Sequence, residues 1–129
     1  MEPLKSTEVF DSPNSKYWFE EGILYVIAKK APELSLEVQK EQMEAFKRKL
    51  DGKKICSIMD VTNTSSSSKE ARDYNTKELP TIFKAIAFII NNPLSRMIAH
   101  LYLGFSPLKF PVKMFSNEKD AKEWIKNYL

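Results

Sequence analysis

The sequence predicts an α/β fold with a mostly parallel sheet and an antiparallel hairpin at its N-terminal end. Two runs rich in aromatic and β-branched residues, 16–20 and 23–28, flank the pair Glu21-Gly22, which is typical of a β-hairpin. After the hairpin, segments with helical and with strand patterns alternate along the chain, and this alternation favours parallel strands packed on helices. We therefore expect the order β-β-α-β-α-β-α-β-α.

The first helix and the strand after it are predicted from capping and breaking residues. Ser35 precedes an apolar stripe with helical spacing, and a serine at this position caps a helix, here expected to run to Leu50. Asp51-Gly52 ends that helix. Residues 54–61 then form a short apolar strand, with the carboxylate of Asp60 near its end.

A second helix is expected after a polar loop of serines and threonines. Ser67 and Glu70 have the S-x-x-E spacing of a capping box, so the helix should begin there and end near Pro80. Residues 85–90 are continuously apolar, as expected of a strand that is covered on both faces.

The last third of the chain predicts helix, strand and helix. Asn92-Pro93 is a good capping and first-position pair for a helix over 93–105. A short strand over 112–115 follows, and Ser116 or Asn117 caps a final helix. The expected buried side of that helix carries Ala121, Trp124, Ile125 and Tyr128.

Composition is that of an ordinary folded domain. The chain has 129 residues, 43% apolar and 29% charged, so we expect one domain over 1–129 rather than a disordered segment. Twenty basic and seventeen acidic residues leave a net charge of +3, and the lysines are scattered among glutamates along the chain. We expect no nucleic-acid partner.

The chain carries few of the residues that chemistry at a site requires. Cys56 is the single cysteine and His100 the single histidine, so neither a disulfide nor a metal site is predicted, and we expect no cofactor. The three glycines match no phosphate-binding loop. The N-terminus lacks a signal-peptide pattern, and the longest apolar run is too short to span a membrane, which favours a cytoplasmic protein.

A strand that ends in Asp60 and a serine-bearing loop that leads into a helix resemble the STAS superfamily. In the anti-sigma-factor antagonists of that group, an Asp-Ser-Ser-Gly turn begins the helix and its first serine can be phosphorylated. The resemblance places Ser66, Ser67 and Ser68 at that turn, where this chain has no preceding aspartate and has Lys69 in place of the glycine.

Most of the chain resembles a group of small bacterial STAS-like or CRAL-TRIO-like proteins of unknown activity. The resemblance is carried by Asn92-Pro93-Leu94-Ser95-Arg96, by Phe110-Pro111-Val112-Lys113-Met114-Phe115 and by Ala121-Lys122-Glu123-Trp124. It implies a single STAS-like domain in a bacterial cytoplasm.

Two polar candidate sites follow. Ser66, Ser67 and Ser68 form either a phosphorylation switch, because a helix N-terminus stabilises phosphate, or simply a cap for the helix. Asp60, Arg72, Arg96 and His100 form a candidate polar site at the carboxyl ends of the strands, where ligands of α/β sheets collect. Solvated helix charges and a histidine without a catalytic partner are the alternative interpretation.

The predicted helix over 93–105 is apolar around most of its circumference, so more than its sheet-facing side must be covered. The covering element is a second copy of the chain, an apolar ligand, or the loop over 106–111 folded back as a lid. The residues concerned are Met97, Leu101, Tyr102, Leu103, Phe105 and Phe110.

These features predict a non-enzymatic regulatory or protein-binding module that acts as a homodimer or on another protein. The alternative is a carrier of a small apolar ligand or lipid in a pocket under 93–111, and an enzyme is the third choice. A large pocket lined by the apolar residues of 97–110 would favour the carrier, and a flat symmetric contact would favour the module.

Overall fold

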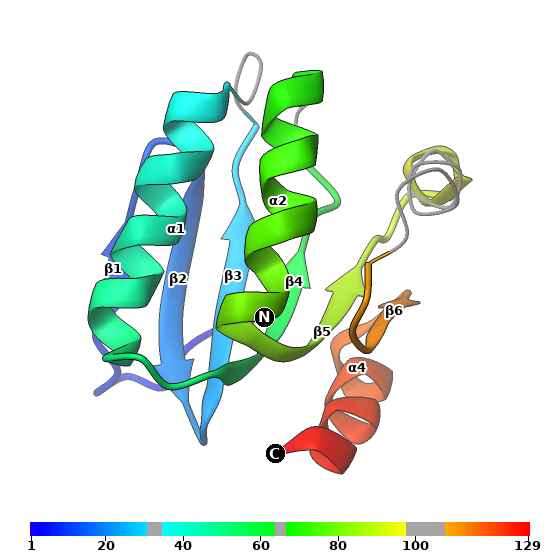
Figure 1. Cartoon of the computed structure of the whole chain (residues 1–129). Helices are drawn as coiled ribbons and strands as arrows, with labels where there is room; N and C mark the ends of the chain where they lie inside the picture. The colour runs from blue at the N-terminus through cyan, green and yellow to red at the C-terminus, as the bar shows by residue number, and fades with distance from the viewer. Residues whose placement is uncertain (31–34, 64–66, 98–107) are drawn as a thin grey trace.

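The structure, a computed structural model, describes residues 1–30, 35–63, 67–97 and 108–129. A six-stranded sheet runs through the molecule in the spatial order β1-β2-β3-β4-β5-β6 (Figure 1). The strands are β1 (Val9–Asp11), β2 (Ser15–Glu20), β3 (Ile23–Ala28), β4 (Ile55–Asp60), β5 (Phe83–Ile89) and β6 (Val112–Phe115). The pairs from β3 to β6 are parallel, and β1, β2 and β3 pair antiparallel. The predicted α/β class is thus confirmed.

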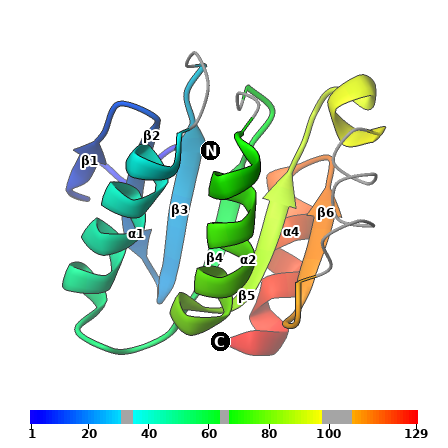
Figure 2. The ribbon, with the colours of Figure 1, turned by 45° about the horizontal axis from the view of Figure 1, so that its top comes forward.

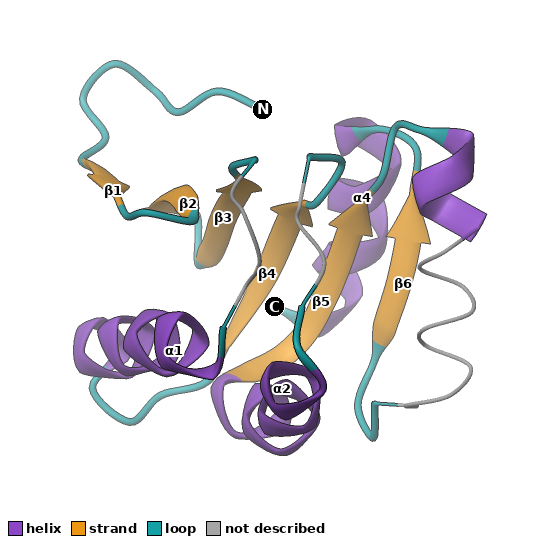
Figure 3. Cartoon of the chain, turned by 90° about the horizontal axis from the view of Figure 1, so that it is seen from above, coloured by secondary structure: helices purple, strands orange, loops and turns teal. Residues whose placement is uncertain are grey.

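Helices cover both faces of the sheet. They are α1 (Leu36–Leu50), α2 (Lys69–Ile82) and α4 (Glu118–Ile125), which continues into a 3-10 turn, η1 (Lys126–Tyr128). Figures 2 and 3 show α1 and α2 side by side on one face and α4 on the other. Residues 93–97, after β5, are also helical.

The hairpin and the capping residues agree with the sequence prediction. Glu21 and Gly22, between β2 and β3, have φ values of 53° and 75°, and two successive positive φ values are typical of the type I′ turn that suits a two-residue hairpin. Ser35 caps α1 by accepting from the Val38 amide, and Asn117 caps α4 by accepting from the Asp120 amide.

Strand β1 was not predicted. It has three residues and no alternating pattern, so its sequence gives no strand signal, and its strand geometry depends on pairing with β2. Phe10 of β1 stacks on Tyr17 of β2 with ring centroids 5.3 Å apart, which fixes the added strand to the sheet.

Helix α2 differs from its prediction at both ends. Its N-cap is Ser68 rather than Ser67, because the Ser68 hydroxyl accepts from the Ala71 amide at 3.2 Å. It also continues through Pro80 to Ile82, and β5 follows directly. Proline has no backbone N–H, so the helix lacks one hydrogen bond at Pro80. Leu79 and Ile82 are buried in the core, and their burial offsets this loss.

Two apolar clusters lie on opposite faces of the sheet. Phe46, Leu24 and Phe83 belong to the cluster under α1 and α2, and the Phe46 and Phe83 rings meet edge to face. On the other face, Trp18 and Ile58 lie in the cluster that packs on α4, where small side chains of β5 let the helix come close. Both faces of the central strands are therefore covered, as the continuous apolar run of β5 predicted.

Candidate functional site

Asp60, Arg72 and Arg96, the described members of the predicted polar site, lie at the end of β4 or on the segments that follow β4 and β5. These segments leave the carboxyl edge of the parallel strands, at the top of Figure 1. Asp60 is the last residue of β4 and pairs with Ile89, the last residue of β5, which confirms its predicted position. The connections that leave these two strands are joined by hydrogen bonds. The Val61 amide donates to the Ile89 carbonyl at 3.0 Å, and the Asn91 amide donates to Thr62 Oγ1 at 3.0 Å.

The carboxylate of Asp60 takes part in a local turn. Its Oδ1 accepts a hydrogen bond from the Thr62 amide at 3.0 Å, and the side chain is half-buried. This is the Asx-turn geometry that ends many strands. The contact shapes the start of the serine loop.

The serine loop leads into α2 through two contacts. Ser68 is the N-cap, and the Ser67 carbonyl accepts from Arg72 Nη1 at 2.6 Å. Ser66 lies outside the described residues. Ser68 thus serves as the capping residue, and phosphorylation of the loop stays a prediction.

The two arginines of the candidate polar site bond to different segments. Arg72 holds the end of the serine loop, whereas Arg96 donates to Ser116 Oγ at 3.0 Å and to the Met114 carbonyl at 3.5 Å. Arg96 therefore fixes the helical residues 93–97 to the end of β6. His100, the fourth predicted member, lies outside the described residues.

The apolar candidate surface is described at its two ends. Met97 is 55% exposed, and Leu94, one helical turn earlier, is 61% exposed. Phe110 is half-buried and packs, with Leu108, against the cluster under α1 and α2. Residues Leu101, Tyr102, Leu103 and Phe105 lie outside the part of the chain that the structure describes.

Cys56 lies in β4 and is fully buried. Burial raises the pKa of its thiol, because the thiolate would lose its hydration, and the positive charge of Lys84 partly opposes this shift. A raised pKa leaves less of the nucleophilic thiolate at neutral pH. We expect Cys56 to be inert toward thiol reagents while the chain is folded.

At the amino edge of the same strands lies a lysine-lined cavity that the sequence analysis missed. Lys49, Lys53, Lys54 and Lys84 line it, with Asp51 among them. These residues come from two distant parts of the sequence, and the spacing of lysines along the chain gives no signal that they meet. Only the pairing of β4 with β5 brings Lys84 to the end of α1.

No helix within residues 1–30, 35–63, 67–97 and 108–129 is long and apolar enough to cross a membrane.

The fold has a solved counterpart. It is similar to an uncharacterised protein of the DUF3478 family with a SpoIIAA-like fold, from Shewanella loihica PV-4, with a TM-score of 0.58 and 21% identity over 92% of this chain and 91% of that chain. At this identity the likeness shows the fold alone, and it confirms the predicted STAS-like fold. No curated protein matches the chain. A family model described as a domain of unknown function, DUF7793, matches residues 17–129, and the chain therefore belongs to the DUF7793 family.

Proposed function

We propose that this chain is a non-enzymatic STAS-like interaction module that pairs with a second copy of itself through the carboxyl edge of its sheet. The observation that carries the proposal is the exposed pair Leu94 and Met97 on the helical residues after β5. Residues three apart on a helix lie on the same side, so the two side chains form one apolar surface.

Hydrogen bonds hold this surface in place. Arg96, between the two apolar residues, bonds to Ser116 and to the Met114 carbonyl, so the segment is held against β6. The large apolar side chains that are exposed in the described part of the chain are Leu4, Val9, Leu94, Met97 and Leu129. Leu94 and Met97 are the members of this set that share one helical turn.

A second copy of the chain is the occupant that this surface favours. An apolar patch is complementary to itself, and two-fold dimers use the same patch on both subunits. Each large apolar side chain that becomes fully buried contributes about 1.5–3 kcal/mol. The sequence continues beyond Met97 with further apolar residues, among them Ile98 and Leu101.

Native mass spectrometry combined with size-exclusion chromatography tests the proposal. The unmodified chain should be a dimer, and Leu94→Glu with Met97→Glu should give folded monomers that still unfold cooperatively, at a melting temperature lowered only by the loss of the dimer contact. Leu129→Glu is the control, because Leu129 is equally exposed, at 56%, and lies on a different element. An unmodified chain that stays monomeric at high concentration would refute the dimer, and so would a double variant that still dimerises.

The second candidate is a carrier of a small apolar ligand under the segment 93–111. The half-buried residues Leu108, Phe110 and Val112 favour this candidate, because they pack against the apolar cluster under α1 and α2. In the same mass spectra a carrier would retain a ligand as added mass on the monomer. Phe110→Ala should remove that mass, and spectra without it would count against the carrier.

A further inference from the structure

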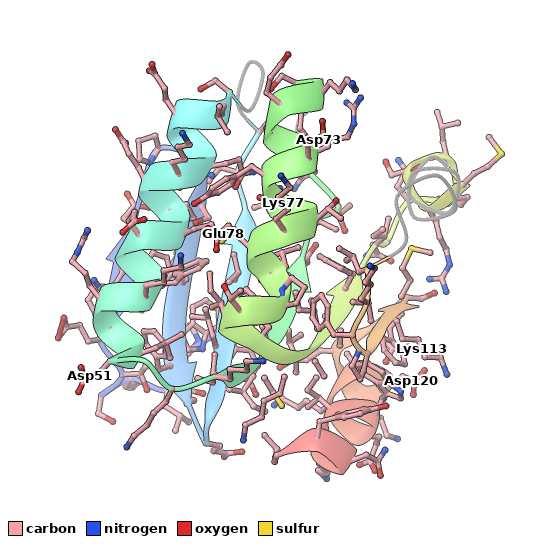
Figure 4. The ribbon with its side chains drawn as sticks, in the orientation of Figure 1. Asp51, Asp73, Lys77, Glu78, Lys113 and Asp120 are labelled. Carbon is pink, nitrogen blue, oxygen red and sulfur yellow. The ribbon has the colours of Figure 1, made fainter. Side chains whose placement is uncertain are left out.

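The amino edge of the parallel sheet, opposite the proposed contact surface, holds an open cavity of about 480 Å³. It lies where α1 ends, where β2 turns into β3 and where β5 begins, at the bottom of Figure 1. Lys49, Lys53, Lys54 and Lys84 line it and are exposed to solvent. Figure 4 labels Asp51, the acidic residue of the lining, at the end of α1.

The lining of this cavity carries a net positive charge. The lining carries four lysines and one aspartate, a formal charge of +3. The chain carries twenty basic and seventeen acidic residues, so removing these five leaves sixteen of each sign. The rest of the chain therefore carries equal numbers of basic and acidic residues.

The four lysines stand apart from the ion pairs of the described residues. Those pairs involve the N-terminal amine and Lys29, Lys47, Lys122 and Lys126. Lys49 is instead positioned by aromatic rings, with its ammonium 4.5 Å from the centre of the Phe10 ring. The positive charge of these lysines would attract an anion to the cavity.

Two backbone features bring the lysines together. Asp51 and Gly52 have φ values of 50° and 79°, and this left-handed turn directs the chain from the end of α1 into the connection that carries Lys53 and Lys54. Across from them, the register of β4 and β5 shifts between Ile55 and Cys56.

The register shift determines the position of Lys84. Ile55 pairs with Phe83 and Cys56 pairs with Ala85, so Lys84 is the extra residue of a β-bulge. Phe83 packs under α1 and α2 while Ala85 packs on the α4 face, although side chains two apart on a regular strand share a face. The bulge thus places Lys84 outside the regular alternation of β5, at the cavity.

We propose that this cavity binds a small, multiply charged anion of the phosphate class, such as a phosphorylated metabolite. Its volume lies within the range of about 300–1,000 Å³ that is usual for small-molecule sites. Lysine ammonium groups bind phosphate as point charges, and four of them suit a ligand with two or more negative charges. The half-buried Leu50 and Ile55 in the lining offer apolar contact to the remainder of the ligand. A cavity of this volume suits a small molecule better than a membrane surface or an acidic protein.

Titration of the isotope-labelled full chain with pyrophosphate, followed by NMR, tests the site. Saturable shifts are expected at the backbone amides of Gly22, Asp51, Lys53 and Lys84. Binding should weaken as the ionic strength rises from about 0.02 M to about 0.2 M, because salt screens the attraction. Shifts that do not saturate, or that centre on another region, would overturn the proposal.

A pair of matched variants separates a site from general attraction. Lys53→Gln with Lys84→Gln should weaken pyrophosphate binding about tenfold or more, since two of the four charges are lost. Lys16→Gln with Lys119→Gln removes the same charge from exposed residues outside the cavity and should change the affinity by less than about twofold. Equal losses in both variants would overturn the site.

Thermal unfolding gives an independent measure. Pyrophosphate should raise the melting temperature of the unmodified chain and of the Lys16/Lys119 variant, because a ligand that binds only the folded state stabilises it. The Lys53/Lys84 variant should fold equally well and show little increase. Binding to vesicles that contain anionic lipid, without any binding of pyrophosphate, would refute a small-molecule site. The dimer proposed above uses the opposite edge, so its failure leaves this result unaffected.

Discussion

The two edges of the parallel strands use their polar side chains in different ways. At the carboxyl edge, Asp60, Ser68 and Arg96 bond to nearby backbone or side-chain groups and fix the loops in place. At the amino edge, Lys53 and Lys84 line an open cavity and stand outside the ion pairs of the described residues. The polar residues singled out in the sequence thus make local structural contacts, whereas the lysines that line the cavity gave no signal in the sequence.

The largest effect on the free energy of unfolding is expected at the amino edge, where Phe83 is buried and the adjacent Lys84 is exposed. Phe83→Ala should lower the free energy of unfolding by about 3–5 kcal/mol, because Phe83 is fully buried and its ring meets Phe46 with centroids 6.2 Å apart. Lys84→Ala should change it by less than about 0.5 kcal/mol, since the side chain is exposed. Urea unfolding measures both values. A large loss from Lys84→Ala would mean that the lysine supports the fold rather than a ligand.

A smaller effect is expected at the carboxyl edge, from the serines. Ser68→Ala should cost about 1 kcal/mol of unfolding free energy, because the Ala71 amide loses its capping partner. Ser67→Ala is the matched control one residue earlier, since Ser67 contributes its backbone carbonyl to Arg72 and that group remains. Thermal unfolding of the two variants shows which serine caps α2. Equal destabilisation would show that the cap is shared between the two serines.

The smallest effect on the free energy of unfolding is expected at Lys47, on α1. Unlike the four lysines of the cavity, Lys47 forms an ion pair. Its ammonium lies 3.0 Å from Glu78 Oε2, between α1 and α2, and Figure 4 labels Glu78 there. The hydrogen bond from Lys47 lowers the pKa of Glu78, and the same bond raises the pKa of Lys47. Both side chains are partly exposed, at 38% and 27%, so Glu78→Gln should cost less than about 1 kcal/mol at neutral pH.

The stabilisation by the Lys47–Glu78 ion pair depends on pH. Because the pKa of Glu78 is lower in the folded chain, its stabilisation is present above the pKa of an unfolded glutamate and is lost as the pH falls through the folded value. The difference in unfolding free energy between the unmodified chain and Glu78→Gln should therefore shrink between about pH 5 and about pH 3. A difference that stays constant with pH would contradict the ion pair.

The local elements could be predicted well because their signals lie within a few residues. The hairpin turn at Glu21 and Gly22, the cap at Ser35 and the strand over 112–115 each depend on backbone preferences of adjacent residues, and all three are present. The shift from Ser67 to Ser68 has a local cause as well. Both serines offer a hydroxyl at the start of the helix, so the spacing to Glu70 alone could not decide between them.

The sequence by itself determined the class of the fold, the order of its main elements and the position of Asp60 at a strand end, because these follow from periodicity and capping. The tertiary structure decided the rest. The pairing of β1, the bulge at Lys84 and the meeting of Lys49 and Lys53 with Lys84 depend on contacts between residues far apart in the chain. The positions of charged residues along a sequence do not predict how close together they lie in the folded chain. Their distances are set only when the strands pair and the helix ends come to one edge of the sheet.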